Sequence, residues 1–198
     1  MFKSIEEMAV AEIIEKKSKF IATLEIADSK EEAEEILQSI RKEYHDSKHN
    51  CYAYIVDNYE KCSDDGEPSG TAGAPLLALL KSYKLSNVII VVTRYFGGIL
   101  LGTGGLVRAY TDVAKKAIEN AKIVDKEYGL RYKIEISYNT LKEIQYFCQK
   151  NNIKIIKYEY GENIHIILES SKEVKEKIEE KMNIIKSKIV KENMIIKK

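Results

Sequence analysis

The chain has 198 residues, 44% of them hydrophobic, which is enough for one or two domains with apolar cores of their own. Its three cysteines are odd in number and lack CxxC spacing, so they argue against a disulfide framework and favour reduced thiols in the cytoplasm. No signal peptide is evident, and the apolar runs reach about eight residues against the roughly 20 of a bilayer span, so we expect no membrane partner.

The formal net charge of +1 by itself predicts nothing about nucleic acid, but the charges are unevenly distributed. Residues 1–128 carry 17 Lys and Arg against 21 Asp and Glu, whereas residues 129–198 carry 15 against 10. This asymmetry favours two domains with different partners. A lysine-rich bias of the whole proteome is an equally simple explanation.

The first half of the chain alternates predicted strands and helices. Apolar alternation predicts strands at 9–14 and 19–26, and the capping-box pair Ser29 and Glu32 predicts a helix as far as about Tyr44. The other elements expected in this half are a strand at 50–56, a short helix with Pro75 in its first turn, a buried strand at 87–93 and a helix after Gly104.

The pattern changes after Val124. The expected elements are a strand at 130–138, a helix at 140–151, a hairpin of strands 153–160 and 163–169, a helix at 171–182 and a last strand to about Val190. This βαββαβ order is that of a ferredoxin-like domain. We therefore predict an α+β protein with domains at 1–124 and 125–198, joined by a linker at 124–129.

Two loops of unusual composition lie in the first half. Residues 94–110 read RYFGGILLGTGGLVRAY, follow the predicted buried strand and hold half of the ten glycines. Residues 63–75 read SDDGEPSGTAGAP and hold three more glycines and both prolines. Glycine allows positive φ and close approach of another group at an entropic cost of roughly 0.5–1 kcal/mol each, so this concentration indicates a specific role.

The glycine-rich loop is a candidate anion-binding site. A strand, a glycine turn and a helix start would aim the backbone N–H groups of Thr103, Gly104 and Gly105 at one point, with Arg94 and Arg108 beside it. The spacing fits neither a Walker motif nor a dinucleotide fingerprint. The alternative is that the glycines only permit tight loop packing.

The acidic loop offers three carboxylates within four residues, Asp64, Asp65 and Glu67. All three could bind magnesium or act as acid and base, or Asp64 and Asp65 could shape the turn through hydrogen bonds to the backbone. A third interpretation is that Asp64 and Asp65 pair with Arg94 or Arg108. We expect Asp64 or Asp65 to approach one of these arginines or an amide of the glycine loop, and we expect no metal site.

Histidine, cysteine and aromatic residues give weaker signals. His45, His49 and Cys51 form an H-x3-H-x-C pattern that allows zinc binding or Cys–His catalysis, but a structural histidine is the simpler interpretation. Tyr95 and Phe96 beside the glycine loop would suit stacking on unpaired bases, or would simply cover the core.

The motifs DDGEPSGTAG…P and RYFGGILLGTGGLVRAY, together with SKFIA at 18–22 and HNCYAY at 49–54, resemble the signatures of the Impact/YigZ family. The resemblance is strong over about the first 125 residues. It implies a first domain like the α+β fold shared by a small-subunit ribosomal protein and elongation factor G, and a ferredoxin-like second domain. Eukaryotic members resemble regulators of a stress-response kinase pathway tied to the ribosome, but they carry a further N-terminal interaction domain, so kinase-pathway regulation is not expected here.

We expect a non-catalytic protein of translational regulation that binds RNA or a ribosome-associated component in a groove between the two loops. A phosphate-containing ligand would fit the same groove, and no cofactor is expected. The expected binding residues are Arg94, Tyr95, Gly97, Gly98, Gly102, Thr103, Gly104, Gly105, Arg108, Asp64, Asp65, Glu67, Thr71 and His49. The alternatives are an enzyme acting on a phosphorylated or nucleotide-like small molecule, with the acidic loop as acid or base, and a pure protein-interaction module.

Overall fold

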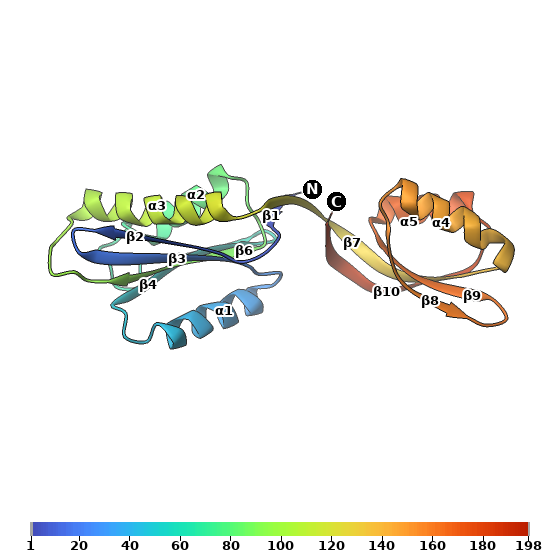
Figure 1. The fold of residues 1–198 in the computed structure, drawn as a ribbon, viewed down its shortest axis with the longest axis horizontal. Helices are drawn as coiled ribbons and strands as arrows, with labels where there is room; N and C mark the ends of the chain where they lie inside the picture. Colours follow the sequence, from blue (N-terminus) through green and yellow to red (C-terminus); the bar gives the residue numbers. More distant parts are fainter. Residues whose placement is uncertain (1, 198) are drawn as a thin grey trace. The chain divides into compact units, whose positions relative to one another are not determined.

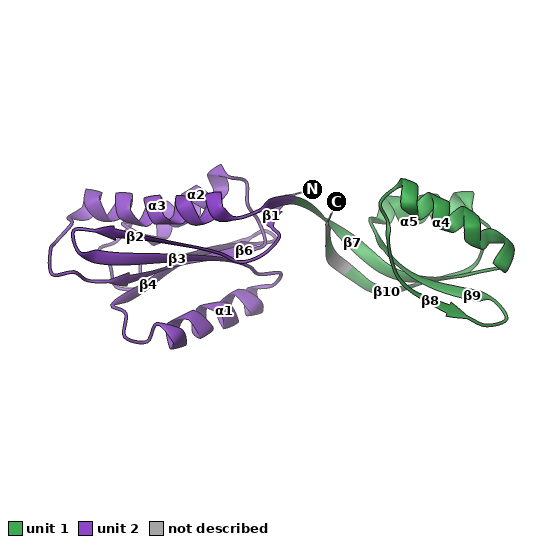
Figure 2. Cartoon of the chain, viewed as in Figure 1, with its two compact units in different colours: residues 1, 125–198 green, residues 2–124 purple. Residues whose placement is uncertain are grey.

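The computed structural model describes residues 2–197, without the side chains of Asn193, Met194 and Lys197. The chain divides into two compact units, Phe2–Val124 in purple and the residues from Asp125 onward in green (Figure 2). Each unit combines an antiparallel sheet with α-helices, which confirms the α+β class. Among the helices of this part of the chain, none has both the length and the apolar content needed to cross a membrane.

The first unit is a three-layer arrangement around a sheet with strand order β2-β3-β6-β4-β5. Its strands are β2 (Ala9–Glu15), β3 (Ser18–Ile26), β4 (His49–Val56), β5 (Tyr59–Ser63) and β6 (Val88–Tyr95). Figure 1 shows α2 (Gly73–Ser82) and α3 (Thr103–Asn120) on one face of the sheet and α1 (Lys30–Glu43) on the other.

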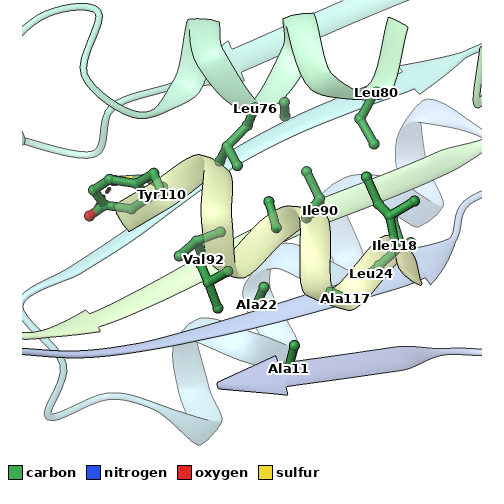
Figure 3. Packing of buried hydrophobic residues seen from close by; sticks show 14 of the residues in the cluster. Ala11, Ala22, Leu24, Leu76, Leu80, Ile90, Val92, Tyr110, Ala117 and Ile118 are labelled. Atoms are coloured by element: carbon green, nitrogen blue, oxygen red, sulfur yellow. Dashed lines mark hydrogen bonds between the residues drawn. The ribbon is translucent and has the colours of Figure 1, made fainter. Parts of the chain in front are cut away.

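Because the sheet is covered on both faces, its central strand β6 is apolar at almost every position. Ile90 and Val92 pack toward α2 and α3, whereas the intervening Val91 packs toward α1. Figure 3 shows Ile90 and Val92 beneath the helical side chains of Leu76 and Tyr110. Burying one such aliphatic side chain contributes roughly 1.5–3 kcal/mol, so the two core layers fix the position of β6 and of the loop that follows it.

The predicted start of α1 is confirmed. The Ser29 hydroxyl accepts a hydrogen bond from the Glu32 amide at 3.1 Å, and the Glu32 carboxylate accepts one from the Asp28 amide at 2.7 Å. The two side chains therefore satisfy backbone donors that the first turn leaves free.

The second unit has the expected βαββαβ order, with a core between the sheet and its two helices. A short 3-10 turn, Tyr138–Thr140, precedes α4. The elements are β7 (Ile123–Ile136), α4 (Leu141–Lys150), β8 (Lys154–Tyr160), β9 (Ile164–Ser170), α5 (Lys172–Lys181) and β10 (Ile184–Lys197). Within this unit the sheet order is β7-β9-β8, and β10 also pairs with β7; β1 (Phe2–Ile5) belongs to the first unit.

Three features differ from the sequence prediction. β1 and β5 were not predicted because they are short and have little alternation. Residues 124–129, predicted as the linker, lie within the regular strand β7, where the boundary between the units falls, and β10 continues beyond Val190 to pair with this part of the strand. Charged residues interrupt the apolar pattern in both of these strand ends, whereas the backbone ladder that joins them does not depend on side-chain type.

Candidate functional site

Asp64 organises the acidic loop and the start of α2. Its Oδ1 accepts hydrogen bonds from the amides of Ala72 and Gly73 at 2.9 and 2.8 Å, and its Oδ2 accepts one from Gly70 at 2.8 Å. Burial alone would raise the pKa of Asp64, but the three amide donors outweigh it and hold the pKa below its ordinary value of 3.8. Asp64 is therefore a structural residue of the loop, as one of the sequence interpretations proposed.

Asp65 fastens the same loop to the sheet and to α1. Its Oδ1 accepts a hydrogen bond from Arg41 Nη2 and its Oδ2 accepts one from the Asn50 amide, both at 2.7 Å. The expectation that Asp64 or Asp65 approaches Arg94, Arg108 or the glycine loop is wrong, because the hydrogen bonds of both carboxylates lie within the acidic loop, α1 and β4.

The carboxylate that joins the two loops is Glu67. It is buried, and its Oε1 lies 2.5 Å from Arg94 Nη1, 2.9 Å from the Tyr110 hydroxyl and 3.8 Å from His49 Nε2. Arg94 is also buried. Its guanidinium lies 5.4 Å from the centre of the Phe20 ring and 5.6 Å from that of Phe96. Glu67 thus neutralises the arginine that the sequence assigned to phosphate binding.

His49 and Cys51 do not pair with each other. His49 Nδ1 lies 2.7 Å from the Asp65 carbonyl oxygen, which can only accept, so Nδ1 carries the proton and Nε2 is directed to Glu67. The Cys51 thiol lies 2.9 Å from the Asp64 carbonyl oxygen, and burial raises its pKa to about 12. Cys51 is therefore a protonated core residue at neutral pH, and Cys–His catalysis has no support. Residues 2–197 contain no cluster of His, Cys, Asp or Glu arranged to hold a metal, and His45 is exposed.

Different physical reasons explain why glycine occupies each position in the glycine-rich loop. A Cβ on Gly97 would lie 2.0 Å from the backbone carbon of Lys17, so this position requires glycine for packing. Gly98 and Gly102 have φ of +85° and +72°, where only glycine is unstrained. A Cβ on Gly104 would meet nothing within 4 Å, and Gly105 meets only the flexible side chain of Leu101. The packing explanation therefore covers Gly97 but not Gly104.

The N-terminus of α3 has no capping side chain, and its first turn contains no acidic residue. The residue before it, Gly102, has no side chain to offer, and Thr103 and Gly104 are exposed. The positive end of the helix dipole therefore faces solvent. Arg108, exposed on α3, lines a separate hollow of about 190 Å³ together with Lys16, Gly105 and Asp112.

A pocket of about 390 Å³ opens where the two loops meet. Its wall is mainly apolar, with Glu67, Arg94 and His49 among its polar residues and the start of α3 at one side. The lining residues are Lys48, His49, Glu67, Pro68, Arg94, Phe96, Leu100, Leu101, Gly102, Thr103 and Leu106. Phe96 and Leu100 are 45% and 82% exposed, so apolar surface stands open to solvent here.

Two predicted binding residues have structural roles instead. The Tyr95 hydroxyl donates a hydrogen bond to Asp46 at 2.8 Å, so the aromatic residue that lines the pocket is Phe96. Thr71 is buried and its hydroxyl donates to the Pro68 carbonyl at 2.6 Å.

The sequence interpretation omitted the apolar and basic members of the pocket wall, which are Lys48, Pro68, Leu100, Leu101 and Leu106. Leu100 lies within a glycine-rich loop, and an apolar residue in such a loop is a signal in the sequence for this surface. Lys48 gave none, because it precedes a strand that is far from the loop in sequence.

Comparison with known proteins gives matches over both units. Residues 16–118 match the model of the Impact N-terminal domain, and residues 134–183 match a domain of unknown function, DUF1949. The chain is 37% identical over 164 residues to the IMPACT family member YvyE of Bacillus subtilis, covering 81% of this chain and 76% of that protein. It is 39% identical over 150 residues to the IMPACT family member YigZ of Escherichia coli, covering 73% and 74%.

A crystal structure of a hypothetical protein, 30% identical, aligns with 92% of this chain and 95% of its own with a TM-score of 0.63. The solved structure thus supports the same fold across most of the chain. With the N-terminal model matching more than half of the sequence and relatives of this identity covering most of it, the chain belongs to the IMPACT family.

Proposed function

We propose that this protein takes part in the regulation of translation and binds single-stranded RNA, free or within a ribosome-associated particle, at the pocket between its two loops. Membership of the IMPACT family supports the link to translation, which is what the resemblance of the two signature loops implies. The RNA ligand is supported by the chemistry of the pocket face.

The uncapped start of α3 beside an exposed aromatic ring carries the proposal. The amides of Thr103, Gly104 and Gly105 offer donors and a positive dipole to a phosphate, and the exposed Lys48 at the pocket wall adds a positive charge. Phe96 offers a ring on which an unpaired base stacks. A phosphate donor set next to an aromatic ring in an open apolar pocket suits a nucleotide of a single strand.

Gly104 allows a test that separates binding from folding. Gly104→Glu places a carboxylate in the first turn of α3, where it favours the helix but repels a phosphate, and the space around this Cβ is open. We expect roughly three- to tenfold weaker binding of fluorescent oligouridine by Gly104→Glu than by Gly104→Gln, with equal or higher melting temperatures. Phe96→Leu keeps the apolar cover of Arg94 and should also weaken binding.

The proposal fails if wild type binds no oligouridine, or if Gly104→Glu and Gly104→Gln bind it equally. The group of partly buried His49 with buried Glu67 and Arg94 at the pocket favours a second candidate, an enzyme acting on a phosphorylated small molecule with His49 Nε2 as acid or base. Turnover of a nucleotide by wild type that is lost in His49→Gln, with RNA binding absent, would favour the enzyme.

A further inference from the structure

The sheet of the second unit has one face without a helix layer. Tyr132, Ile134 and Ile166 point into the core that α4 and α5 cover. Because side chains alternate along a strand, Arg131, Lys133 and the residues paired with them point to the opposite side. Figure 1 shows both helices of this unit on the same side of its sheet.

The charged side chains on this open face are predominantly basic, and His165 and Ile167 of β9 lie among them. Strand register places basic side chains from β7, β8 and β10 on it, and the carboxylates there belong to β7, β8 and β9. The basic residues, which we call the basic sheet face, are Arg131, Lys133, Lys154, Lys157, Lys186, Lys188 and Lys191. The carboxylates over the same part of the sheet are Glu135, Glu159 and Glu169.

The ion pairs on this face involve the basic side chains of β7 and β8, and among the described residues they leave the lysines of β10 without a carboxylate partner. Glu169 is paired with Arg131 and lies 3.6 Å from Lys154, and Glu159 lies 2.8 Å from Lys133 and 2.9 Å from Lys157. The four basic groups on β7 and β8 therefore share two carboxylates.

Three lysines of β10 remain. Lys186, Lys188 and Lys191 pair in register with Glu135, Lys133 and Arg131, are exposed, and have no ion pair with any described residue. Lys188 and Lys191 each stand opposite another cation, an arrangement that costs free energy in the free protein and that a bound polyanion would relieve. Lys186 and Lys188 are two residues apart along the strand, a span of roughly 7 Å that suits neighbouring phosphates of an extended single strand, and Lys191 follows after a register shift.

We propose that the basic sheet face is a second RNA-binding surface, contacting the phosphate backbone of a single strand along β10. The inference rests on the proposed RNA binding but concerns other residues, so the two can fail separately. Lysine on an edge strand also discourages edge-to-edge pairing of sheets, and a test must separate that role from binding.

The test uses the full chain and oligouridine, with affinity measured as a function of salt concentration. The triple variant Lys186→Gln, Lys188→Gln, Lys191→Gln should lower the slope of log affinity against log salt by roughly 2, about 0.7 for each phosphate that is no longer neutralised. The matched control, Lys142→Gln, Lys150→Gln, Lys172→Gln, removes the same charge from exposed helix positions and should leave the slope nearly unchanged. Lys→Arg at the three β10 positions should retain binding, and size-exclusion chromatography should show the β10 Gln variant unaggregated.

Equal slopes for the two Gln triples would overturn the inference while leaving the pocket proposal intact. A loss in the β10 triple together with indifference to Gly104→Glu would support the sheet face and reject the pocket. Absence of RNA binding by wild type would reject both. If the β10 triple instead lost binding to vesicles of phosphatidylserine and phosphatidylcholine with unchanged RNA affinity, the surface would be a membrane contact and the RNA assignment would be wrong.

Discussion

Glu67 Oε1 lies 2.5 Å from Arg94 Nη1, and both side chains are buried, so one ion pair connects the acidic loop to the strand from which the glycine-rich loop departs. Removing one member of a buried pair leaves an uncompensated charge, which costs about 3–5 kcal/mol. We expect Glu67→Ala to lower the free energy of unfolding by about this amount in urea titrations.

The exposed pair of Glu12 and Lys19, 2.7 Å apart, provides the control, because exposed pairs contribute about 0–1 kcal/mol. A cycle with Glu67→Ala, Arg94→Ala and the double variant should show strong coupling, since the double variant leaves no lone charge. A Glu67→Ala protein no less stable than Glu12→Ala would show that the pair does not hold the loops.

The glycines of one loop should differ sharply in their tolerance of a methyl group. Gly97→Ala forces a Cβ into the Lys17 backbone and should cost about 3 kcal/mol or prevent folding. Gly104→Ala has open space in a helix and should stabilise the protein by up to about 1 kcal/mol. Thermal and urea unfolding of the two variants test this difference, and similar effects at both positions would contradict the loop geometry.

Asp64 should make the first unit sensitive to acid. Its pKa in the folded protein lies below its ordinary value, so its stabilising effect is complete above about pH 4 and is lost as the pH falls through the folded pKa. Asp64→Asn should be less stable at neutral pH by about 1–3 kcal/mol, because charged acceptors make the stronger hydrogen bonds. Its free energy of unfolding should also fall less than that of wild type on acidification. Parallel curves for the two proteins between neutral pH and about pH 3 would rule out this role.

The second unit should fold by itself. Its core is built from β7, α4, β9 and α5 without residues of the first unit, and its βαββαβ order closes within the fragment. A fragment that begins at Ile123, the first residue of β7, should give a dispersed amide NMR spectrum and a cooperative melt. A collapsed spectrum for this fragment would place the domain boundary elsewhere.

The core elements could be predicted from the sequence because their apolar residues repeat with the period of the element they form, as in β3 and α3. Which of the three carboxylates of the acidic loop enters the site could not be predicted from the sequence. Asp65 and Gly66 both have positive φ, and this reversal directs Asp64 and Asp65 toward the backbone and α1 while Glu67 enters the core. Spacing along the chain carries no information about such a path. The same limit explains why Lys48 was missed.

The two-residue turn between β2 and β3 has Lys16 and Lys17 at φ of 46° and 65°, the pattern of a tight type I′ hairpin. Gly97 packs on the backbone of this turn, and its amide donates a hydrogen bond to the Ser18 hydroxyl at 3.1 Å. An inserted residue in this turn would displace Gly97, which follows the pocket residue Phe96. Although hairpin tips are ordinarily tolerant places to lengthen a chain or to attach a tag, this one is a poor choice.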